Sequence, residues 1–220
     1  MVNLIITGIV ALLSIAFGCA YIKLDAIKAQ KSLGAILPKN LKQVLFGTGF
    51  IVSILAAFLI LVCFYDCNWI FAIKRVIFCS ALWPLAFIDY REHIIPNKVL
   101  LYLLIVRIAI AGIEMIADFN TAKTELLGCL IAAIGMLVLL CVMRLIVKNG
   151  IGFGDIKLFV VMGLYYGVRG SISTLFLSFV VSFIVSIFML VTKRKSKKDH
   201  IAFAPSILVG TLLSTLIVGA

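Results

Sequence analysis

The sequence has few charged residues for its length. Only 13% of its 220 residues are charged, nine are aspartate or glutamate, and two are histidine. A soluble globular domain carries about 25% charged residues, so the composition excludes a soluble domain. Hydrophobic residues make up 64% of the chain instead, with a mean hydropathy of +1.25. We therefore predict an all-α integral membrane protein, because helices satisfy their own backbone hydrogen bonds in lipid.

The six cysteines form no C-x-x-C pair. Cys63 and Cys67 are spaced C-x₃-C, which leaves a disulfide or a metal half-site open. We favour the interpretation of all six as small hydrophobic side chains, and we expect no metal and no cofactor. The N-terminus has neither a basic segment nor a small-residue cleavage site, so it is predicted to be a retained span. The net charge of +11 needs no nucleic-acid partner, because basic loops are ordinary in membrane proteins and contact membrane lipid.

About eight apolar segments predict a polytopic helix bundle, since a span needs roughly 20 apolar residues. Their ranges are Val2–Ile22, Val44–Tyr65, Trp69–Asp89, Val99–Ala117, Leu126–Val147, Ile156–Val168, Ser171–Thr192 and Ile201–Ala220. We expect one membrane domain over residues 1–220. Lys74 and Arg75 fall inside the third segment and are expected to snorkel to the interface.

The basic residues of the loops predict the orientation of the chain. The odd-numbered loops hold fourteen of them: Lys23, Lys28, Lys31, Lys39, Lys42, Arg91, Lys98, Arg144, Lys148, Lys193, Arg194, Lys195, Lys197 and Lys198. The even-numbered loops hold four: Lys74, Arg75, Lys123 and Arg169. Because lysine and arginine collect in the cytoplasm, the odd loops are predicted to be cytoplasmic and both termini extracytoplasmic.

Two aspartates lie at this predicted cytoplasmic face. Asp89 ends the third segment, and Asp155 begins the sixth. The sixth segment has 13 residues, which reach only about 20 Å of a hydrocarbon core roughly 30 Å thick. It must therefore start below the membrane surface, and Asp155 with it.

The residues around each aspartate predict turns. Gly152 and Gly154 precede Asp155 and let other chain segments approach closely. After Asp89, Pro96 favours an extended residue before it and ends the helix, and Asn97 is predicted to be the N-cap of the next one. Lys157 either biases the ionisation of the aspartates or snorkels to the interface, and we favour the second.

Two carboxyl groups at one partly dry site can share a proton. The ionised one can then take a proton from water while the other hydrogen-bonds a scissile carbonyl, which is metal-free peptide hydrolysis. A proton-coupled transporter would also explain carboxyl groups in a membrane. A non-catalytic assembly factor is a third hypothesis.

Three segments resemble the type IV prepilin peptidases, a family of G-x-G-D intramembrane aspartic proteases. Gly-Phe-Gly-Asp-Ile-Lys-Leu over 152–158 is similar to the family's G-x-G-D-x-K-L motif. Residues 84–97 resemble its first-aspartate motif, in which Ile-Pro-Asn follows the aspartate. Residues 201–210 match its I-P-F-G-P stretch more loosely, with Ala202 and Ala204 replacing Pro and Gly. The resemblance covers about residues 70–220, and 1–69 would add two spans with a basic cytoplasmic loop.

The resemblance implies an aspartic endopeptidase in the bacterial cytoplasmic membrane. It would cut prepilins or pseudopilins after a glycine, between a basic leader and a hydrophobic helix, with Asp89 and Asp155 as catalytic residues. Longer members bind zinc through paired C-x-x-C motifs and N-methylate the product. The loop Lys23–Gln43 has no cysteine, so we expect no zinc and do not extend the methyltransferase activity to this chain.

Three further polar residues stand near these segments. Arg107 and Glu114 are seven positions apart, about 10 Å of helical rise. We judge this too far for a direct pair and expect Arg107 to meet a carbonyl or carboxylate of another helix. His93 is expected to be a solvated loop residue.

Overall fold

A computed structural model describes residues 69–146, 151–191 and 202–218 of the chain. Every regular element within these ranges is an α-helix, in the order α3 to α7. The predicted spans Val2–Ile22 and Val44–Tyr65, the loop between them and the basic run at 193–198 lie outside the described residues. The chain divides into two units between Pro84 and Leu85, inside α3 (Trp69–Glu92).

The first part of α3 belongs to the N-terminal unit and holds two buried cations. The side chains of Lys74 and Arg75 are only 2% and 3% exposed. The Arg75 guanidinium lies 3.8 Å from the centroid of the Phe71 ring, and the Lys74 ammonium lies 5.5 Å from it. The expectation that both snorkel to the interface is therefore wrong. The electron-rich face of the ring attracts the two cations, which holds them beside Phe71.

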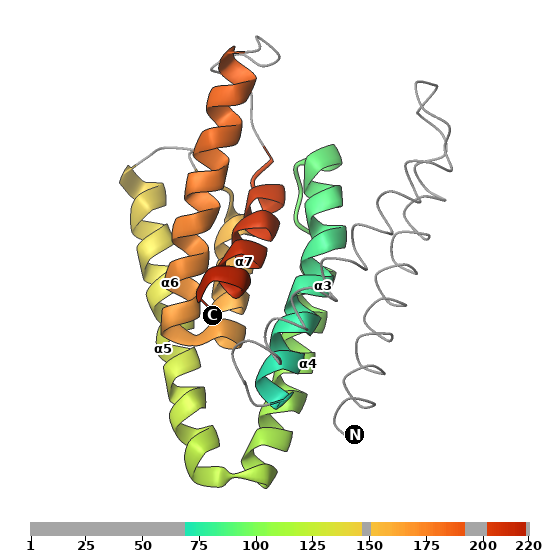
Figure 1. The fold of residues 1–220 in the computed structure, drawn as a ribbon, viewed down its shortest axis with the longest axis vertical. Coiled ribbons are helices and arrows are strands. Elements are labelled where there is room, and N and C mark those ends of the chain that lie inside the picture. Colours follow the sequence, from blue (N-terminus) through green and yellow to red (C-terminus); the bar gives the residue numbers. More distant parts are fainter. Residues whose placement is uncertain (1–68, 147–150, 192–201, 219–220) are drawn as a thin grey trace, which may run out of the picture. The chain divides into compact units, whose positions relative to one another are not determined.

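The C-terminal unit contains α4 (Asn97–Ala117) and α5 (Phe119–Ile146), which form an antiparallel hairpin (Figure 1). Asp118 joins them. Its carboxylate accepts hydrogen bonds from the backbone N–H groups of Asn120 and Thr121, at 3.2 and 3.3 Å, and from the Thr121 hydroxyl at 2.6 Å. Asp118 thus caps the first turn of α5, whose N–H groups have no partner inside the helix.

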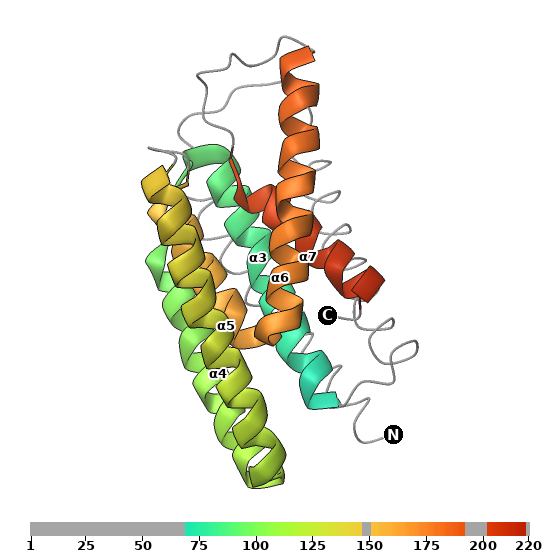
Figure 2. The same cartoon turned by 90° about the vertical axis from the view of Figure 1, so that its left-hand side faces the viewer.

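The next helical stretch, α6 (Phe153–Val191), contains a sharp break at Gly167. Gly167 has φ +64° and ψ −169°, a conformation that glycine adopts readily because it has no Cβ. The chain turns back at this point (Figure 2). Residues near both ends of α6 accordingly lie beside the α3–α4 connection: Gly154 packs against Ile95, and Val185 lines one pocket with His93. The break falls where the sequence separates the predicted sixth and seventh segments.

The second half of α6 packs closely against α7 (Ala204–Val218). A Cβ on Gly210 would lie 2.6 Å from the backbone nitrogen of Ser178 and 2.7 Å from its Cα. The hydroxyls of Ser173 and Ser214 share a hydrogen bond of 2.7 Å across the same interface. Small residues and interhelical hydroxyl contacts are typical of helix packing in membranes, where backbones approach closely.

The lengths and compositions of the helices fit a membrane protein. Among the described residues, α3, α4, α5 and α6 are long and apolar enough to cross a bilayer, while α7 is a shorter apolar helix. Large apolar side chains such as Ile116, Leu145 and Phe183 are exposed on them. This confirms the predicted helical class; the count of eight spans and the orientation of the termini stay predictions.

Candidate active site

Asp89 lies in the last turns of α3, within the C-terminal unit, and its side chain is buried at 6% exposure. Its Oδ2 accepts a hydrogen bond of 2.8 Å from the backbone N–H of Ala204. Ala204 is the first residue of α7, so the bond is made at the N-terminus of a helix, where N–H groups lack partners inside the helix. One hydrogen bond therefore fixes a carboxyl group of α3 to the start of α7, 115 residues later.

Asp155 is the third residue of α6, and its side chain folds back over the turn that precedes the helix. The Gly152 N–H donates a hydrogen bond to the Asp155 carboxylate. A Cβ on Gly152 would lie only 2.9 Å from Oδ2 of Asp155. An N3 carboxylate bonded to the N-cap N–H is one half of a capping box. The absence of a side chain at Gly152 leaves the space that this arrangement occupies.

Two contacts hold the 151–155 turn against its neighbours. A Cβ on Gly154 would lie 3.0 Å from Cβ of Ile95, so the start of α6 packs tightly on the α3–α4 connection. On the other side, the Arg144 guanidinium lies 3.7 Å from the centroid of the Phe153 ring, and Arg144 also donates to the Ile151 carbonyl. The turn that carries Asp155 is thus attached to both α5 and the residues that follow Asp89.

The structure brings the two aspartates close enough to repel each other electrostatically. They come from α3 and α6, and both are shielded from solvent, Asp89 fully and Asp155 in part. Two carboxyl groups in such surroundings do not both ionise easily, so a pair of this kind is suited to holding one proton between its members.

The other three predicted site residues, Pro96, Asn97 and Lys157, lie at the starts of α4 and α6. Lys157 points outward and donates a hydrogen bond of 3.2 Å to Oδ1 of Asn97. The prediction that Asn97 is the N-cap of α4 is wrong, because Pro96 occupies that position with extended backbone, φ −69° and ψ 123°. Asn97 is the first helical residue, and its side-chain oxygen is used by Lys157. The hydrogen bond between Lys157 and Asn97 joins α4 to α6.

An apolar pocket of about 180 Å³ opens beside Tyr90, the residue that follows Asp89. It is formed by the residues that follow Asp89, by the second half of α6 and by the start of α7. Its lining consists of Tyr90, His93, Val181, Val185, Met189, Ala202, Pro205, Ser206 and Val209. Sequence reasoning did not find this pocket, because its walls come from three separated segments. It did place His93 in a loop, and His93 is indeed exposed there.

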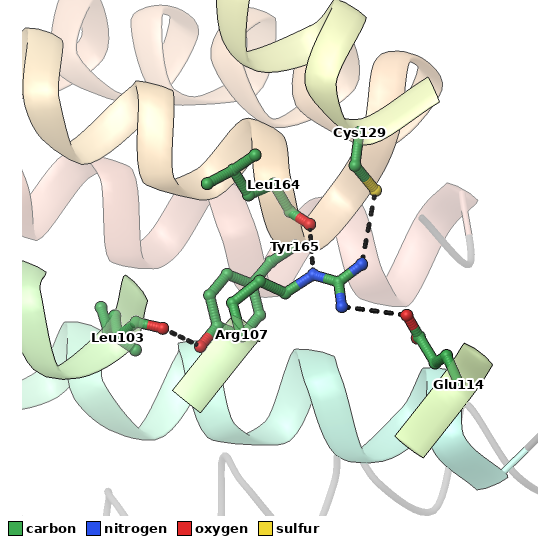
Figure 3. Close-up of polar contacts among 6 residues, drawn as sticks. All are labelled: Leu103, Arg107, Glu114, Cys129, Leu164 and Tyr165. Atoms are coloured by element: carbon green, nitrogen blue, oxygen red, sulfur yellow. Dashed lines mark hydrogen bonds and ion pairs between the residues drawn. The ribbon is translucent and has the colours of Figure 1, made fainter. Parts of the chain in front are cut away.

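A second polar cluster is centred on Arg107 of α4 (Figure 3). Arg107 donates a hydrogen bond of 2.9 Å to the Glu114 carboxylate and another of 2.7 Å to the Leu164 carbonyl. The judgement that Arg107 and Glu114 are too far apart is wrong. It compared the rise between their backbones, whereas two long side chains on the same helix face can span two turns between them. The expected bond to a carbonyl of another helix is present.

The same cluster ties α4 to its two neighbours. The Arg107 guanidinium also contacts the Cys129 sulfur of α5 at 3.8 Å. The Tyr165 hydroxyl of α6 donates a hydrogen bond of 2.7 Å to the Leu103 carbonyl of α4. All of these groups are buried or nearly so, and they give the cluster a structural role in joining α4, α5 and α6 (Figure 3).

Fold and site together define a helical membrane protein that holds two acidic side chains from distant segments at one place. Comparison with known proteins gives the family. The model of the type IV leader peptidase family matches residues 76–187, which include both aspartates. This chain belongs to the type IV leader peptidase family.

A curated relative agrees with this assignment. The chain is 33% identical over 141 residues to a protein of Bacillus subtilis (strain 168) described as "Prepilin leader peptidase/N-methyltransferase". The matched region is 64% of this chain and 54% of the relative, so the chain spans about half the length of the curated relative it matches. No solved structure matches the chain.

Proposed function

We propose that this protein is a membrane aspartic endopeptidase that removes the short basic leader of prepilins or pilin-like precursors at the cytoplasmic face of the bacterial membrane. One observation carries the proposal: Asp89 and Asp155, 66 positions apart in the sequence, interact electrostatically inside the region that matches the peptidase family. The excess of basic residues in the odd-numbered loops supports the cytoplasmic orientation.

In the proposed reaction, a water molecule lies between the two carboxyl groups. The ionised carboxylate takes a proton from this water as the water oxygen attacks the scissile carbonyl. The protonated carboxyl group donates a hydrogen bond to the carbonyl oxygen, where negative charge develops. Collapse of the tetrahedral intermediate breaks the C–N bond, and a proton passes from the pair to the leaving amine. No covalent bond to the enzyme forms.

Backbone contacts position the pair for this chemistry. The Ala204 N–H holds Oδ2 of Asp89 at 2.8 Å, and the Gly152 N–H holds the Asp155 carboxylate over the turn. Both donors are fixed by helix starts, so they require no side-chain rearrangement. A carboxyl pair held in this way is organised before substrate binds, which lowers the reorganisation needed in the transition state.

The pocket beside Tyr90 fits the substrate class. A pilin-like precursor places a hydrophobic helix directly after the cleaved bond. The pocket presents the apolar side chains of Val181, Val185, Met189 and Val209 together with Tyr90, which follows Asp89 in the chain. The first side chains after the scissile bond can enter it and lose contact with water. Their burial favours binding by about 25 cal/mol per Å².

The direct test uses the full chain reconstituted in lipid nanodiscs with a purified pilin-like precursor. We expect release of the basic leader and a shortened helix with a new N-terminus, both identified by mass spectrometry. The Bacillus subtilis relative, assayed in parallel, shows that the precursor is cleavable. A precursor that the relative cleaves and this protein leaves intact would contradict the proposal.

A further inference from the structure

A second groove, separate from the pocket beside Tyr90, lies between α4, α5 and α6. It encloses about 520 Å³. Its residues are Asn97, Lys98, Leu100, Leu101, Leu104, Leu137, Lys157, Val160 and Val161. The proposed cleavage reaction assigns no step to the residues that line this groove. Neither Asp89 nor Asp155 is among them.

The groove has one charged end and an apolar body. Its three polar residues, Asn97, Lys98 and Lys157, all belong to the first turns of α4 or α6. The leucines and valines of α4 and α6 follow within about two turns along the same helices, and Leu137 of α5 completes the apolar wall. A groove of this shape matches a molecule with a polar head and a hydrocarbon chain, rather than a uniformly apolar ligand.

The charged end of the groove is positive, and no acidic residue among the described residues of the groove neutralises it. Lys98 and Lys157 are both exposed, and the described residues that line the groove include no aspartate or glutamate. The hydrogen bond of 3.2 Å from Lys157 to Asn97 fixes this end across the α4–α6 gap. The N-terminal ends of both helices add positive partial charge at the same end. The complementary ligand therefore carries an anionic head.

The size of the groove argues against a helix as its occupant. One turn of a helix with its side chains is about 10 Å wide and 5.4 Å long, or roughly 420 Å³. The groove would hold little more than a single turn. A basic leader would also be repelled by Lys98 and Lys157. A flexible hydrocarbon chain can occupy the same space along its whole length.

We propose that this groove binds an anionic phospholipid, with its phosphate between Lys98 and Lys157 and one acyl chain against Leu100, Leu104 and Val160. Basic pockets between membrane helices are known to bind anionic head groups in this way. Two lysines near the head group predict an affinity about 30-fold higher for an anionic lipid than for a zwitterionic lipid with the same chains. The proposal stands independently of the peptidase function.

The test is native mass spectrometry of the full chain in detergent, titrated separately with phosphatidylglycerol and phosphatidylcholine of identical acyl chains. We expect the protein to retain phosphatidylglycerol at about 30-fold lower lipid concentration. The double variant Lys98→Gln and Lys157→Gln should bind both lipids equally. The matched control, Lys123→Gln and Arg169→Gln, removes the same charge at exposed positions outside the groove and should keep the preference.

A third variant tests the groove itself. Leu104→Trp fills the apolar body while both lysines remain, and it should weaken retention of phosphatidylglycerol at least tenfold. Circular dichroism shows that each variant is folded. The proposal is overturned if the unsubstituted protein does not distinguish the two lipids, if the control double variant loses the preference equally, or if Leu104→Trp retains phosphatidylglycerol fully. Masses of a dimer that disappear with Leu104→Trp would assign the groove to a second copy instead.

Discussion

Replacing Gly210 by alanine tests whether the α6–α7 contact positions the site. The added Cβ would lie 2.6 Å from the Ser178 nitrogen and 2.7 Å from its Cα. Non-bonded heavy atoms pack at about 3.5 Å or more. Because both clashes involve backbone atoms, no side-chain rotation relieves them, and α7 must move away from α6 by about 1 Å.

The free energy of this change has two parts. Forcing an extra methyl group into a packed interface costs about 1–3 kcal/mol. Replacing glycine by alanine inside a helix recovers up to about 1 kcal/mol. The net expectation is a loss of about 1–2 kcal/mol in the free energy of unfolding, which lowers the ratio of folded to unfolded protein roughly 5- to 30-fold.

The same movement reaches Asp89. The Ala204 N–H lies at the start of α7, 2.8 Å from Oδ2 of Asp89. A shift of about 1 Å takes this pair beyond normal hydrogen-bond length. Misplacement of a reacting group by about 1 Å lowers a rate by about 100-fold. We therefore expect Gly210→Ala to reduce the rate of precursor cleavage at temperatures where the variant is still folded.

The assay combines thermal unfolding in detergent with initial cleavage rates in nanodiscs. Gly135→Ala is the control, because no heavy atom lies within 4 Å of its added Cβ. It should raise the unfolding temperature slightly and leave the rate unchanged. A Gly210→Ala variant that behaves like Gly135→Ala in both measurements would refute the packing argument.

Three further substitutions test individual contacts. Ala204→Pro removes the N–H that binds Asp89 but suits the first turn of a helix, so cleavage should fall about 10- to 100-fold with α7 intact by circular dichroism. Arg107→Gln breaks the buried ion pair with Glu114 from one side and should destabilise the protein by about 3–5 kcal/mol, whereas combined Arg107→Met and Glu114→Leu should destabilise it much less. The pKa of Asp118 lies below its usual value of 3.8 because the Thr121 hydroxyl and amide donate to its carboxylate. Asp118→Ala should therefore lower the unfolding temperature at pH 7, by an amount that shrinks as pH falls below 3.8.

A different result would contradict each of these three predictions. Ala204→Pro with full activity would show that the Asp89 hydrogen bond is dispensable. Equal unfolding temperatures for Arg107→Gln and the double variant would show that removing one partner of the ion pair costs no more than removing both. An effect of Asp118→Ala that is the same at pH 2 and pH 7 would show that the carboxylate does not act as the cap of α5.

The sequence predicts those features that depend on residue type and chain order. The helix α4 follows from an apolar run between Pro96 and Asp118, and the boundary between the predicted segments Ile156–Val168 and Ser171–Thr192 falls near the break at Gly167. Asp89 and Asp155 stand out because carboxyl groups are rare in apolar stretches. Their predicted role awaits the experiments described above.

Other features depend on side-chain reach and on backbone groups, which residue types do not reveal. The ion pair of Arg107 and Glu114 was not predicted, because the helical rise per residue does not include the length of two long side chains. The hydrogen bond from the Ala204 N–H to Asp89 was not predicted, because every residue except proline carries a backbone N–H. The contact of the Arg75 guanidinium with the Phe71 ring depends on the orientation of the ring, which the sequence does not give. Lys74 and Arg75 are therefore buried where the sequence predicted that they snorkel.

The central claim is that Asp89 and Asp155 act as one catalytic unit. The most direct test measures the precursor cleavage rate of Asp89→Asn, Asp155→Asn and the double variant in nanodiscs. Asp118→Asn, at an exposed position between α4 and α5, serves as the matched control and should keep the full rate. We predict that each single variant loses at least about 100-fold in rate and that the double variant loses no more than either single one. Full cleavage by either folded single variant would contradict the account.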